Sequence, residues 1–289
     1  MPTHGELAVK ALEGKVAIIL GGTSGMGART AEVFAEQGAK VVIAGRRSEA
    51  GERLADKIGP AASFLRTDAA SQPDLEALIG TTFARHGRID CLFNNAGYGI
   101  PQRSIADLNM DEFDGQVAVI LRAVFLTMKY VAPIMIGRRS GCILNTGSIA
   151  AHRSGLSSQT YSALRAAVVH ASKCVAAELG EHNVRVNSIS PGAIVTGVFA
   201  KGAGVDPDLA DRHLETVSKR LVGAQPIPRA GLPEDIARAA AFLASDAGSF
   251  INGIDLVVDG GAITGNRFSA GAEARRELLE AVKQEIAAG

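Results

Sequence analysis

The chain has 289 residues, 47% of them hydrophobic, with 30 basic and 30 acidic side chains, which is enough to bury one large core. A net charge of zero gives no electrostatic reason to expect nucleic acid or an anionic membrane as a partner. Three cysteines without metal-ligand spacing argue against a disulfide framework, and the histidines show no metal spacing, so we expect no metal site. No apolar run approaches the roughly 18 residues that span a bilayer, and residues 1–15 lack a signal-peptide pattern. We expect a cytoplasmic protein.

In chain order, short apolar runs rich in β-branched residues alternate with amphipathic stretches. Strands are expected over 15–20, 40–45, 63–68, 89–97, 141–148, 184–192 and 254–261. Helices are expected over 30–39, 48–58, 72–86, 111–137, 160–182 and 233–244. This alternation predicts an α/β fold, with a single doubly wound parallel sheet sandwiched between helices. In such a fold, the ligand site lies at the carboxyl ends of the strands.

We expect residues 1–289 to form a single domain with its core over 15–261. The segment 197–231, rich in Gly, Ala and Pro, is interpreted as a mobile lid, with an ordinary surface excursion as the alternative. The tail over 270–287 carries an apolar stripe on a charged helix, formed by Leu278, Leu279, Val282 and Ile286. We expect this tail to dock on the body or on a neighbouring subunit.

The stretch "LGGTSGMG" (20–27) lies between the first strand and the first helix. Gly21, Gly25 and Gly27 allow a sharp turn and close approach to a pyrophosphate, which the helix N-terminus stabilises. A lone glycine-rich turn is weak evidence, but its place directly after a first strand strengthens the prediction of a nucleotide site.

The end of the second strand indicates which nucleotide is bound. An acidic residue there would grip a ribose 2′-hydroxyl and repel a 2′-phosphate. Here the strand ends in Gly45, followed by Arg46 and Arg47, and a guanidinium can hold a phosphate through paired hydrogen bonds. NADP is therefore favoured over NAD, with two solvated surface arginines as the alternative.

A second cluster lies in "SGLSSQTYSALRAA" (154–167), where Tyr161 and Arg165 are four residues apart. On a helix this spacing stacks a phenol beside a permanent cation. Oxidising a secondary alcohol needs a base for the hydroxyl proton and an acceptor for the hydride. Because a neighbouring cation favours the phenolate, the pair suits a tyrosine that acts as acid and base.

The motifs "LGGTSGMG", "NNAG", Ser148, Tyr161 and "SPG" occur in register, and together they make the chain resemble the short-chain dehydrogenase/reductase family from about Lys15 to Gly261. The resemblance implies a Rossmann-like domain that assembles as a homodimer or homotetramer. It implies an NAD(P)-dependent oxidoreductase that transfers a hydride between the nicotinamide and a small secondary alcohol or ketone. Apolar side chains of the lid, at Val198, Phe199, Leu209 and Leu214, suggest that this substrate is apolar or cyclic.

Residue by residue, the resemblance implies a catalytic set of Ser148, Tyr161 and Arg165. Tyr161 would be the acid/base, and Ser148 would hydrogen-bond the substrate oxygen. The glycine loop would bind the pyrophosphate, Arg46 the 2′-phosphate, Asp68 and Ala69 the adenine, and Asn95 to Gly97 the ribose side. The implied cofactor residues are Gly21, Ser24, Gly25, Met26, Gly27, Arg46, Asp68, Ala69, Asn95, Ala96, Gly97, Tyr161, Arg165, Pro191, Gly192, Ile194 and Thr196.

Three positions depart from the family pattern. Arg165 replaces the usual lysine, Ile120 stands where the family has an asparagine that positions a relay water, and Leu20 replaces a common threonine. Arginine does not give up a proton and isoleucine cannot hydrogen-bond water, so the usual proton relay is in doubt.

Two alternatives stay open. A Ser–Tyr–Arg set also resembles halohydrin dehalogenases, non-redox relatives in which an aromatic residue occupies the glycine-loop region. Gly25 stands in that place here, which leaves room for a dinucleotide. The other alternative is a catalytically weak nucleotide-binding subunit. His152, four residues after Ser148, is either a proton donor at the pocket rim or an ordinary loop histidine.

Overall fold

The computed structural model describes residues 10–199, 205, 210–265 and 267–288. Its centre is a parallel sheet of seven strands in the order β3-β2-β1-β4-β5-β6-β7. The strands are β1 (Val16–Leu20), β2 (Lys40–Gly45), β3 (Ala62–Arg66), β4 (Cys91–Asn94), β5 (Gly141–Thr146), β6 (Val184–Pro191) and β7 (Asp255–Val258). The order reverses between β1 and β4, which opens a crevice at the carboxyl ends of these strands.

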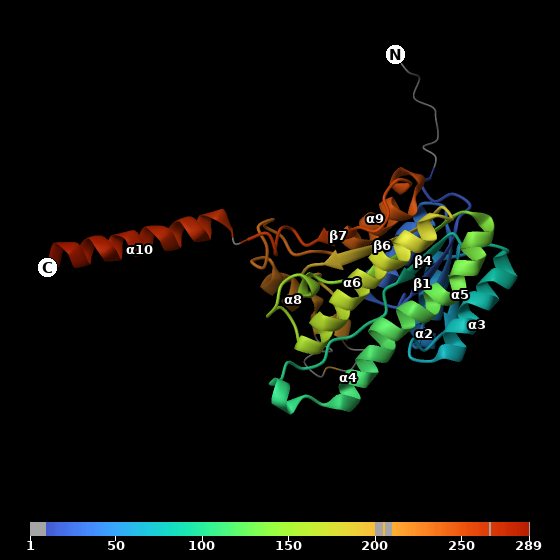
Figure 1. Ribbon diagram of the computed structural model, residues 1–289, viewed down its shortest axis with the longest axis horizontal. Helices are drawn as coiled ribbons and strands as arrows, with labels where there is room; N and C mark the ends of the chain where they lie inside the picture. The colour runs from blue at the N-terminus through green and yellow to red at the C-terminus, as the bar shows by residue number, and fades with distance from the viewer. Residues whose placement is uncertain (1–9, 200–204, 206–209, 266, 289) are drawn as a thin grey trace, which may run out of the picture.

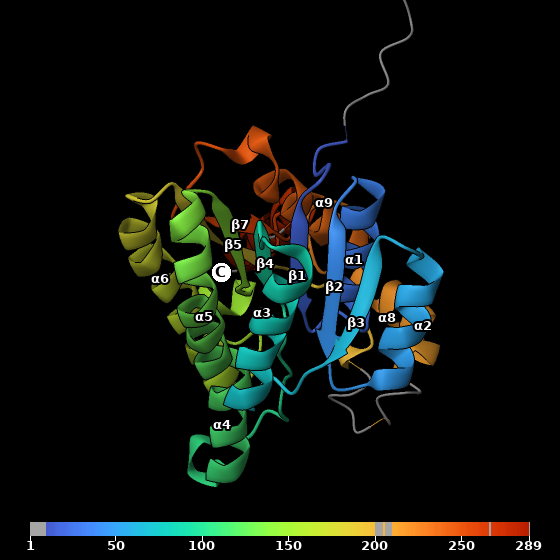
Figure 2. The same cartoon turned by 90° about the vertical axis from the view of Figure 1, so that its right-hand side faces the viewer.

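Helices cover both faces of the sheet (Figures 1 and 2), as the sequence predicts for a doubly wound α/β fold. One face carries α1 (Gly25–Glu36), α2 (Ser48–Ile58) and α9 (Pro233–Ala244). The other carries α3 (Gln72–His86), α4 (Met110–Gln116), α5 (Ala123–Arg138) and α6 (Gln159–Gly180). Successive side chains of a strand point to opposite faces of the sheet, so each strand contributes to both hydrophobic cores. Ile18 and Leu20 of β1 pack on the side of α3, α5 and α6, whereas Ala17 and Ile19 pack on the side of α1 and α9.

The predicted helix over 111–137 is continuous but not uniform. A π-helical stretch, Val117–Arg122, lies between α4 and α5, and the fully buried Ile120 belongs to it. The helix Met110–Arg138 contains an 18-residue window with a mean hydropathy of 1.8, so by length and composition alone it could cross a membrane, and the expectation that no apolar run approaches this length is wrong. Its core-facing side chains, among them Val124 and Met128, instead pack against the sheet.

The C-terminal segments differ in how they meet the body. The tail forms α10 (Phe268–Ala288), which projects away from the sheet (Figure 1). Its apolar stripe, Leu278, Leu279, Val282 and Ile286, is exposed, so the expected docking on its own body is wrong. The predicted lid over 197–231 contains α8 (Leu214–Leu221), while residues 200–204 and 206–209, Leu209 included, lie outside the described residues.

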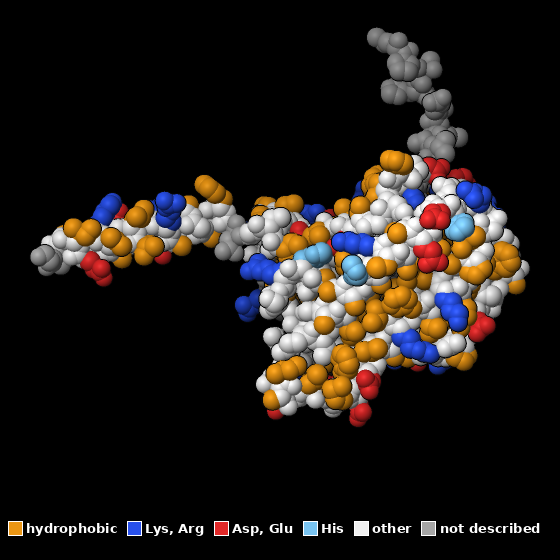
Figure 3. Space-filling view, viewed as in Figure 1, with side chains coloured by type: hydrophobic (Ala, Val, Ile, Leu, Met, Phe, Trp, Pro, Cys, Tyr) orange, Lys and Arg blue, Asp and Glu red, His pale blue; other side chains and the backbone are white. Residues whose placement is uncertain are grey.

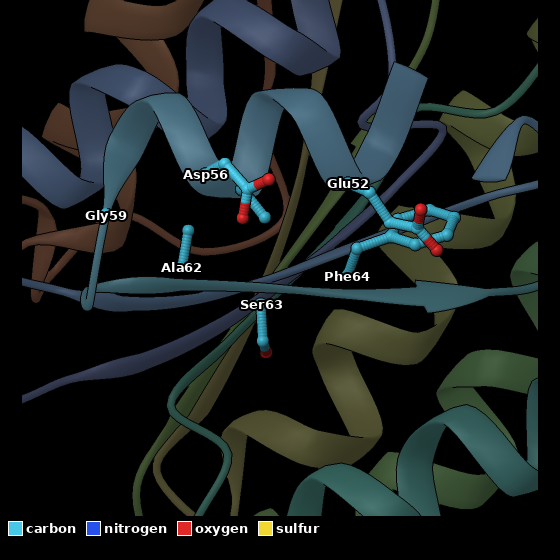
Figure 4. Close-up of a pocket in the computed structure, with 7 residues that line it drawn as sticks. Glu52, Asp56, Gly59, Ala62, Ser63 and Phe64 are labelled. Carbon is cyan, nitrogen blue, oxygen red and sulfur yellow. The ribbon is translucent and has the colours of Figure 1, made fainter. Parts of the chain in front are cut away.

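A hollow of about 390 Å³ lies between α2 and the edge strand β3 (Figure 4). Ala62 and Phe64 point from β3 toward α2, whereas Ser63 points to the opposite side of the strand. Acidic side chains from α2, Glu52 and Asp56, line it. Because β3 is the outermost strand beside β2, this hollow is remote from the crevice between β1 and β4.

An ion-pair cluster joins α1 to α9. Arg29 of α1 hydrogen-bonds Glu234 of α9, and its Nη1 lies 2.9 Å from carboxylate oxygens of both Glu32 and Glu36. The side chains of Arg29 and Glu234 are only 30% and 28% exposed. The hydrogen bond from Arg29 lowers the pKa of Glu234.

We predict that Arg29→Met lowers the free energy of unfolding at pH 7 by about 1 kcal/mol, because three carboxylates lose their shared cation. Since the pKa of Glu234 is lowered in the folded state, the stabilisation is present above the ordinary value of 4.5 and is lost as the pH falls through the lowered value. Urea unfolding of both proteins between pH 7 and pH 3 measures this.

Arg238→Met is the matched control, because Arg238 also pairs with Glu234 but its side chain is 76% exposed. It should cost less than Arg29→Met. Equal unfolding free energies for Arg29→Met and the parent at pH 7 would show that the cluster is only a surface feature.

Candidate functional site

The glycine loop between β1 and α1 is closed by its own backbone. The amides of Gly21 and Gly22 donate to the carbonyl of Ala44, 2.8 and 3.0 Å away. Gly21 has φ +78°, and a Cβ there would lie 2.7 Å from the amide nitrogen of Ala96. A Cβ on Gly27 would lie 2.1 Å from the carbonyl oxygen of Gly21. Any larger residue would therefore push the loop off β4 or off the start of α1.

The N-terminus of α1 is open to an anion. Ser24 occupies the N-cap position without capping the helix through its side chain, and the first turn, which is fully described and includes Met26, contains no acidic residue. A Cβ on Gly25 would lie 3.1 Å from the methyl group of Thr196, so the loop faces the segment that follows β6. Free amides and the helix dipole at this end suit a pyrophosphate.

The structure separates the two arginines that follow β2. Arg47 reaches across the glycine loop: its Nη2 lies 2.5 Å from Ser24 Oγ and 3.2 Å from Thr23 Oγ1. Arg46 is exposed. Burial raises the pKa of the Tyr98 phenol, and the positive charge of Arg46 partly offsets this rise. A side chain at Gly45 would have its Cβ 2.9 Å from the Thr23 methyl group.

The segment after β4 connects the glycine loop to β5. Asn95 donates from Nδ2 to the carbonyl of Gly21 at 3.1 Å and accepts from Thr146 Oγ1 at 3.4 Å. Its backbone amide donates to the carbonyl of Leu20. Asn95 therefore fixes the position of Ala96 and Gly97 against the ends of β1 and β5.

Ser148 and Tyr161 come from neighbouring elements at the carboxyl end of the sheet. Ser148 follows β5 after one intervening residue, Gly147, and begins the 3-10 turn η3 (Ile149–Ala151), where its Oγ accepts from the amide of Ala150 at 3.1 Å. Tyr161 lies on the first turn of α6, whose N-cap is Ser158. Its ring is half-buried and packs against the core on this face of the sheet.

Arg165 lies one turn further along α6 and is 4% exposed. Its Nη1 donates to the carbonyl of Thr146 at 2.6 Å, and its guanidinium carbon lies 5.1 Å from the centre of the Tyr161 ring. A Cβ on Gly97 would lie 2.1 Å from Nη2, so the guanidinium lies directly against the "NNAG" loop. The predicted proximity of the phenol and the cation is thus present in the structure.

No carboxylate of the described chain lies within ion-pair distance of Arg165, and its buried Nε has no hydrogen-bond partner. A buried cation without a counter-ion is costly unless an oxygen-rich ligand or a phenolate approaches it. Together with the glycine cradle, this orphaned group fits a nicotinamide dinucleotide bound across the crevice.

The other predicted cofactor residues line the two ends of the crevice. Gly192 donates to the carbonyl of Val258, and Ile194 forms a bridge with Gly231, while Pro191 ends β6 and Thr196 is buried. Asp68 is farther out, after β3, where its Oδ1 accepts from the amide of Ala70. Ala69 beside it is buried in the core.

Sequence reasoning missed three contacts of the site. The sequence could not show that Arg47 contacts the glycine loop, because the side-chain directions of adjacent residues after a strand depend on the local backbone. The carbonyl of Thr146 carries no sequence signal at all. Gln116, fully buried, donates to the carbonyl of Tyr98 and accepts from Thr160, the residue before the catalytic tyrosine candidate.

Comparisons with known proteins agree with this geometry. A family model described as enoyl-(acyl carrier protein) reductase matches residues 21–263. The chain is 40% identical to tropinone reductase-like 1 of Erythroxylum coca over 87% of this chain and 91% of the relative. It is 37% identical to (+)-borneol dehydrogenase 1 of Salvia officinalis over 87% of this chain and 95% of the relative.

A solved structure of a short chain dehydrogenase/reductase family protein superposes with a TM-score of 0.74 at 35% identity. It is covered completely by 88% of this chain. With the crevice, the motifs and these relatives in agreement, the chain belongs to the short-chain dehydrogenase/reductase family and is an NAD(P)-dependent oxidoreductase.

Proposed function

We propose that the protein is an NADP-preferring oxidoreductase that interconverts apolar or cyclic secondary alcohols and ketones through Ser148, Tyr161 and Arg165. The observation that carries the proposal is the buried guanidinium of Arg165, which has no carboxylate among the described residues and lies between the Tyr161 ring and Gly97. A cation in that place would offset the negative charge that develops on the phenol oxygen while Tyr161 transfers a proton.

Tyr161 takes the hydroxyl proton during oxidation and returns it during reduction. Ser148 hydrogen-bonds the same substrate oxygen and so orients it toward the phenol. Arg165 stays charged throughout, because a guanidinium does not release its proton at neutral pH. With Ile120 fully buried and unable to bind water, the proton has no exit through the helix behind Arg165.

The nicotinamide, when bound, supplies or accepts the hydride. Gly21, Ser24, Gly25, Met26 and Gly27 would hold the pyrophosphate at the N-terminus of α1. Asn95 to Gly97 and Arg165 would hold the ribose side. The remaining contacts would come from Asp68, Ala69, Pro191, Gly192, Ile194 and Thr196.

The preference for NADP rests on the end of β2. Gly45 carries no carboxylate, so the usual repulsion of a 2′-phosphate is absent. An acidic side chain at this position would also have to displace Thr23. Arg47 crosses the glycine loop, and Arg46 is exposed beside Tyr98. Two guanidinium groups at this corner would attract a phosphate and pair with its oxygens.

The substrate class rests on apolar side chains near the crevice and on the relatives. Leu156, Val198 and Phe199, close in the chain to Tyr161 and Thr196, are each more than 40% exposed. Unpartnered apolar groups of this kind offer a surface for an apolar molecule. The names tropinone reductase-like and (+)-borneol dehydrogenase refer to a cyclic ketone and a cyclic alcohol.

We also propose a cytoplasmic homodimer or homotetramer without nucleic acid or membrane partners. Hydrophobic side chains gather over α4 and α5 (Figure 3), and Phe125 on α5 is 48% exposed. Other apolar side chains of α5 and α6, namely Val124, Val168 and Val169, are buried. The three cysteines are free thiols, which suits a reducing compartment.

The first prediction concerns the cofactor. Calorimetry should show binding of both nucleotides, with NADP tighter than NAD, because only NADP carries the phosphate that Arg46 and Arg47 face. Arg46→Asp should shift the preference toward NAD by restoring an acidic group at this corner. Arg53→Asp, at an exposed site on α2, is the control. No binding of either nucleotide would refute the proposed reaction, and tighter NAD binding would refute the preference.

The second prediction concerns the catalytic set. Tyr161→Phe should lower turnover at least about 100-fold while leaving NADP affinity nearly unchanged, because the glycine loop supplies most of the binding. Arg165→Met should have a similar effect on turnover, and Arg165→Lys should retain or raise it, because lysine keeps the charge and can pass a proton on. Rates with one accepted secondary alcohol over a range of pH measure this.

Wild-type turnover by Tyr161→Phe would show that the phenol is not the acid and base. An inactive Arg165→Lys, together with nucleotide-independent conversion of a halohydrin by the parent, would assign the arginine to lyase chemistry instead.

The third prediction concerns assembly. Light scattering at micromolar concentration should give at least twice the monomer mass of 29.9 kDa. Phe125→Glu should reduce that mass if α5 lies in the interface, because a carboxylate would be buried without a partner. The control is Phe83→Glu on α3, where the parent side chain is 42% exposed. A monomeric parent would contradict the assembly.

A further inference from the structure

A buried carboxylate lies on β7 at the edge of the proposed site. The side chain of Asp255 is 5% exposed, and its Oδ1 accepts from Ser188 Oγ at 2.6 Å and from Ser190 Oγ at 3.0 Å. Both serines belong to β6 and are fully buried on the face covered by α6. Such a carboxylate is stable only when hydrogen bonds satisfy it and a cationic or polar hydrogen-bond donor faces its other oxygen.

His152 supplies that second partner. Its Nε2 lies 2.6 Å from Oδ2 of Asp255, across more than 100 residues of sequence. His152 stands at the end of η3, the turn that Ser148 begins. Its Nε2 is therefore held at the sheet edge, and the role of proton donor at the pocket rim, which the sequence left open, stays a prediction for Nδ1.

The carboxylate lies at the junction of the two turns that carry the chemistry. A Cβ on Gly147, the residue before Ser148, would lie 2.3 Å from Ser190 Oγ and 3.4 Å from Asp255 Oδ1. The amide of Gly147 donates to the carbonyl of Ile189 at 2.7 Å. Ser190 directly precedes Pro191, where the nicotinamide-binding segment begins. Asp255 thus contacts both the Ser148 side and the nicotinamide side of the crevice.

Besides this contact, the Ser148 turn is held by the Gly147 amide, by packing of η3 against α6, and by Arg153, whose Nη1 donates to the carbonyl of Ala262 at 3.4 Å. The helix η3 is a single 3-10 turn of three residues, and the loop that follows it is exposed over 153–156. Local hydrogen bonds close the turn but do not attach it to the sheet: Ala151 donates to the Ser148 carbonyl and His152 to that of Ile149. Short turns of this kind are weakly stable alone.

We propose that His152 and Asp255 are positioning residues that fix the Ser148 turn against the nicotinamide-binding end of β6. The proposal rests on the assignment of Ser148 to the substrate oxygen. The pair acts through Ser148 and touches neither substrate nor cofactor. An error in the direction of Ser148 Oγ would lower the rate of the chemical step far more than it would weaken nucleotide binding.

The kinetic test compares three variants with the parent. His152→Ala should lower kcat about tenfold with a smaller change in KM and with unchanged NADP affinity, since the glycine loop is untouched. His152→Gln should recover most of the rate, because its amide can still donate to Asp255. His170→Ala, at an exposed histidine on α6, should behave as the parent.

Hydrogen exchange gives a readout that does not depend on turnover. In His152→Ala, the amides of residues 148–153 and those of Ser190 and Gly192 should exchange faster, while those in the second half of α6 should not. His152→Gln should restore slow exchange in both segments. A general loss of stability would instead accelerate exchange in β1 and α6 alike and would not distinguish the two segments.

Parent-like exchange over 148–153 in His152→Ala would overturn the proposal, whether or not the parent turns over a substrate. So would a His152→Gln variant as impaired in kcat as His152→Ala. If the parent shows no nucleotide-dependent turnover while exchange responds as expected, the proposed function fails and the tether stands. If Tyr161→Phe abolishes turnover but His152→Ala does not lower kcat, only the positioning role fails.

Discussion

A cation can remain buried without a carboxylate only where carbonyl oxygens, an aromatic face or a ligand compensate for its lost hydration. Arg165 satisfies this constraint through the carbonyl of Thr146 and the ring of Tyr161, with one nitrogen left unpaired. The surroundings follow from it. Gly97 must lack a side chain, because a Cβ there would occupy the space of Nη2. The Tyr161 ring is therefore placed by its contact with the same buried cation.

The same guanidinium changes how a proton can leave. In relatives with lysine and asparagine, the resemblance implies a relay behind the tyrosine. Here Arg165 keeps its protons. At position 120, in the π-helical stretch, stands the fully buried hydrocarbon side chain of Ile120. The π-helical stretch Val117–Arg122 remains, although the residue that would bind water there is absent. On the proposed assignment of Tyr161 as acid and base, its proton would leave through the crevice, because the Tyr161 side chain is only half-buried there.

Much of this arrangement could be predicted from the sequence, because it depends on local patterns. Strand and helix alternation follows from apolar periodicity, and the glycine loop follows from its place after β1. The Tyr161–Arg165 contact follows from helical spacing. Contacts set by long-range pairing could not be predicted. The contact of Arg47 with Ser24 depends on where the glycine loop lies, and the partner of His152 depends on the pairing of β6 with β7.

The placement of Ser148 shows how local and long-range contacts combine. On one side, the carbonyl of Thr146 accepts from Arg165; on the other, His152 is bound to Asp255. The serine thus lies between two tethers that involve polar groups buried or nearly buried in the sheet edge and in α6. A change at Arg165 would consequently act twice, on the cation that lies over the Tyr161 ring and on the end of β5 that leads to Ser148. A change at His152 would act only on the second, which makes the two contributions separable by comparing their effects on rate.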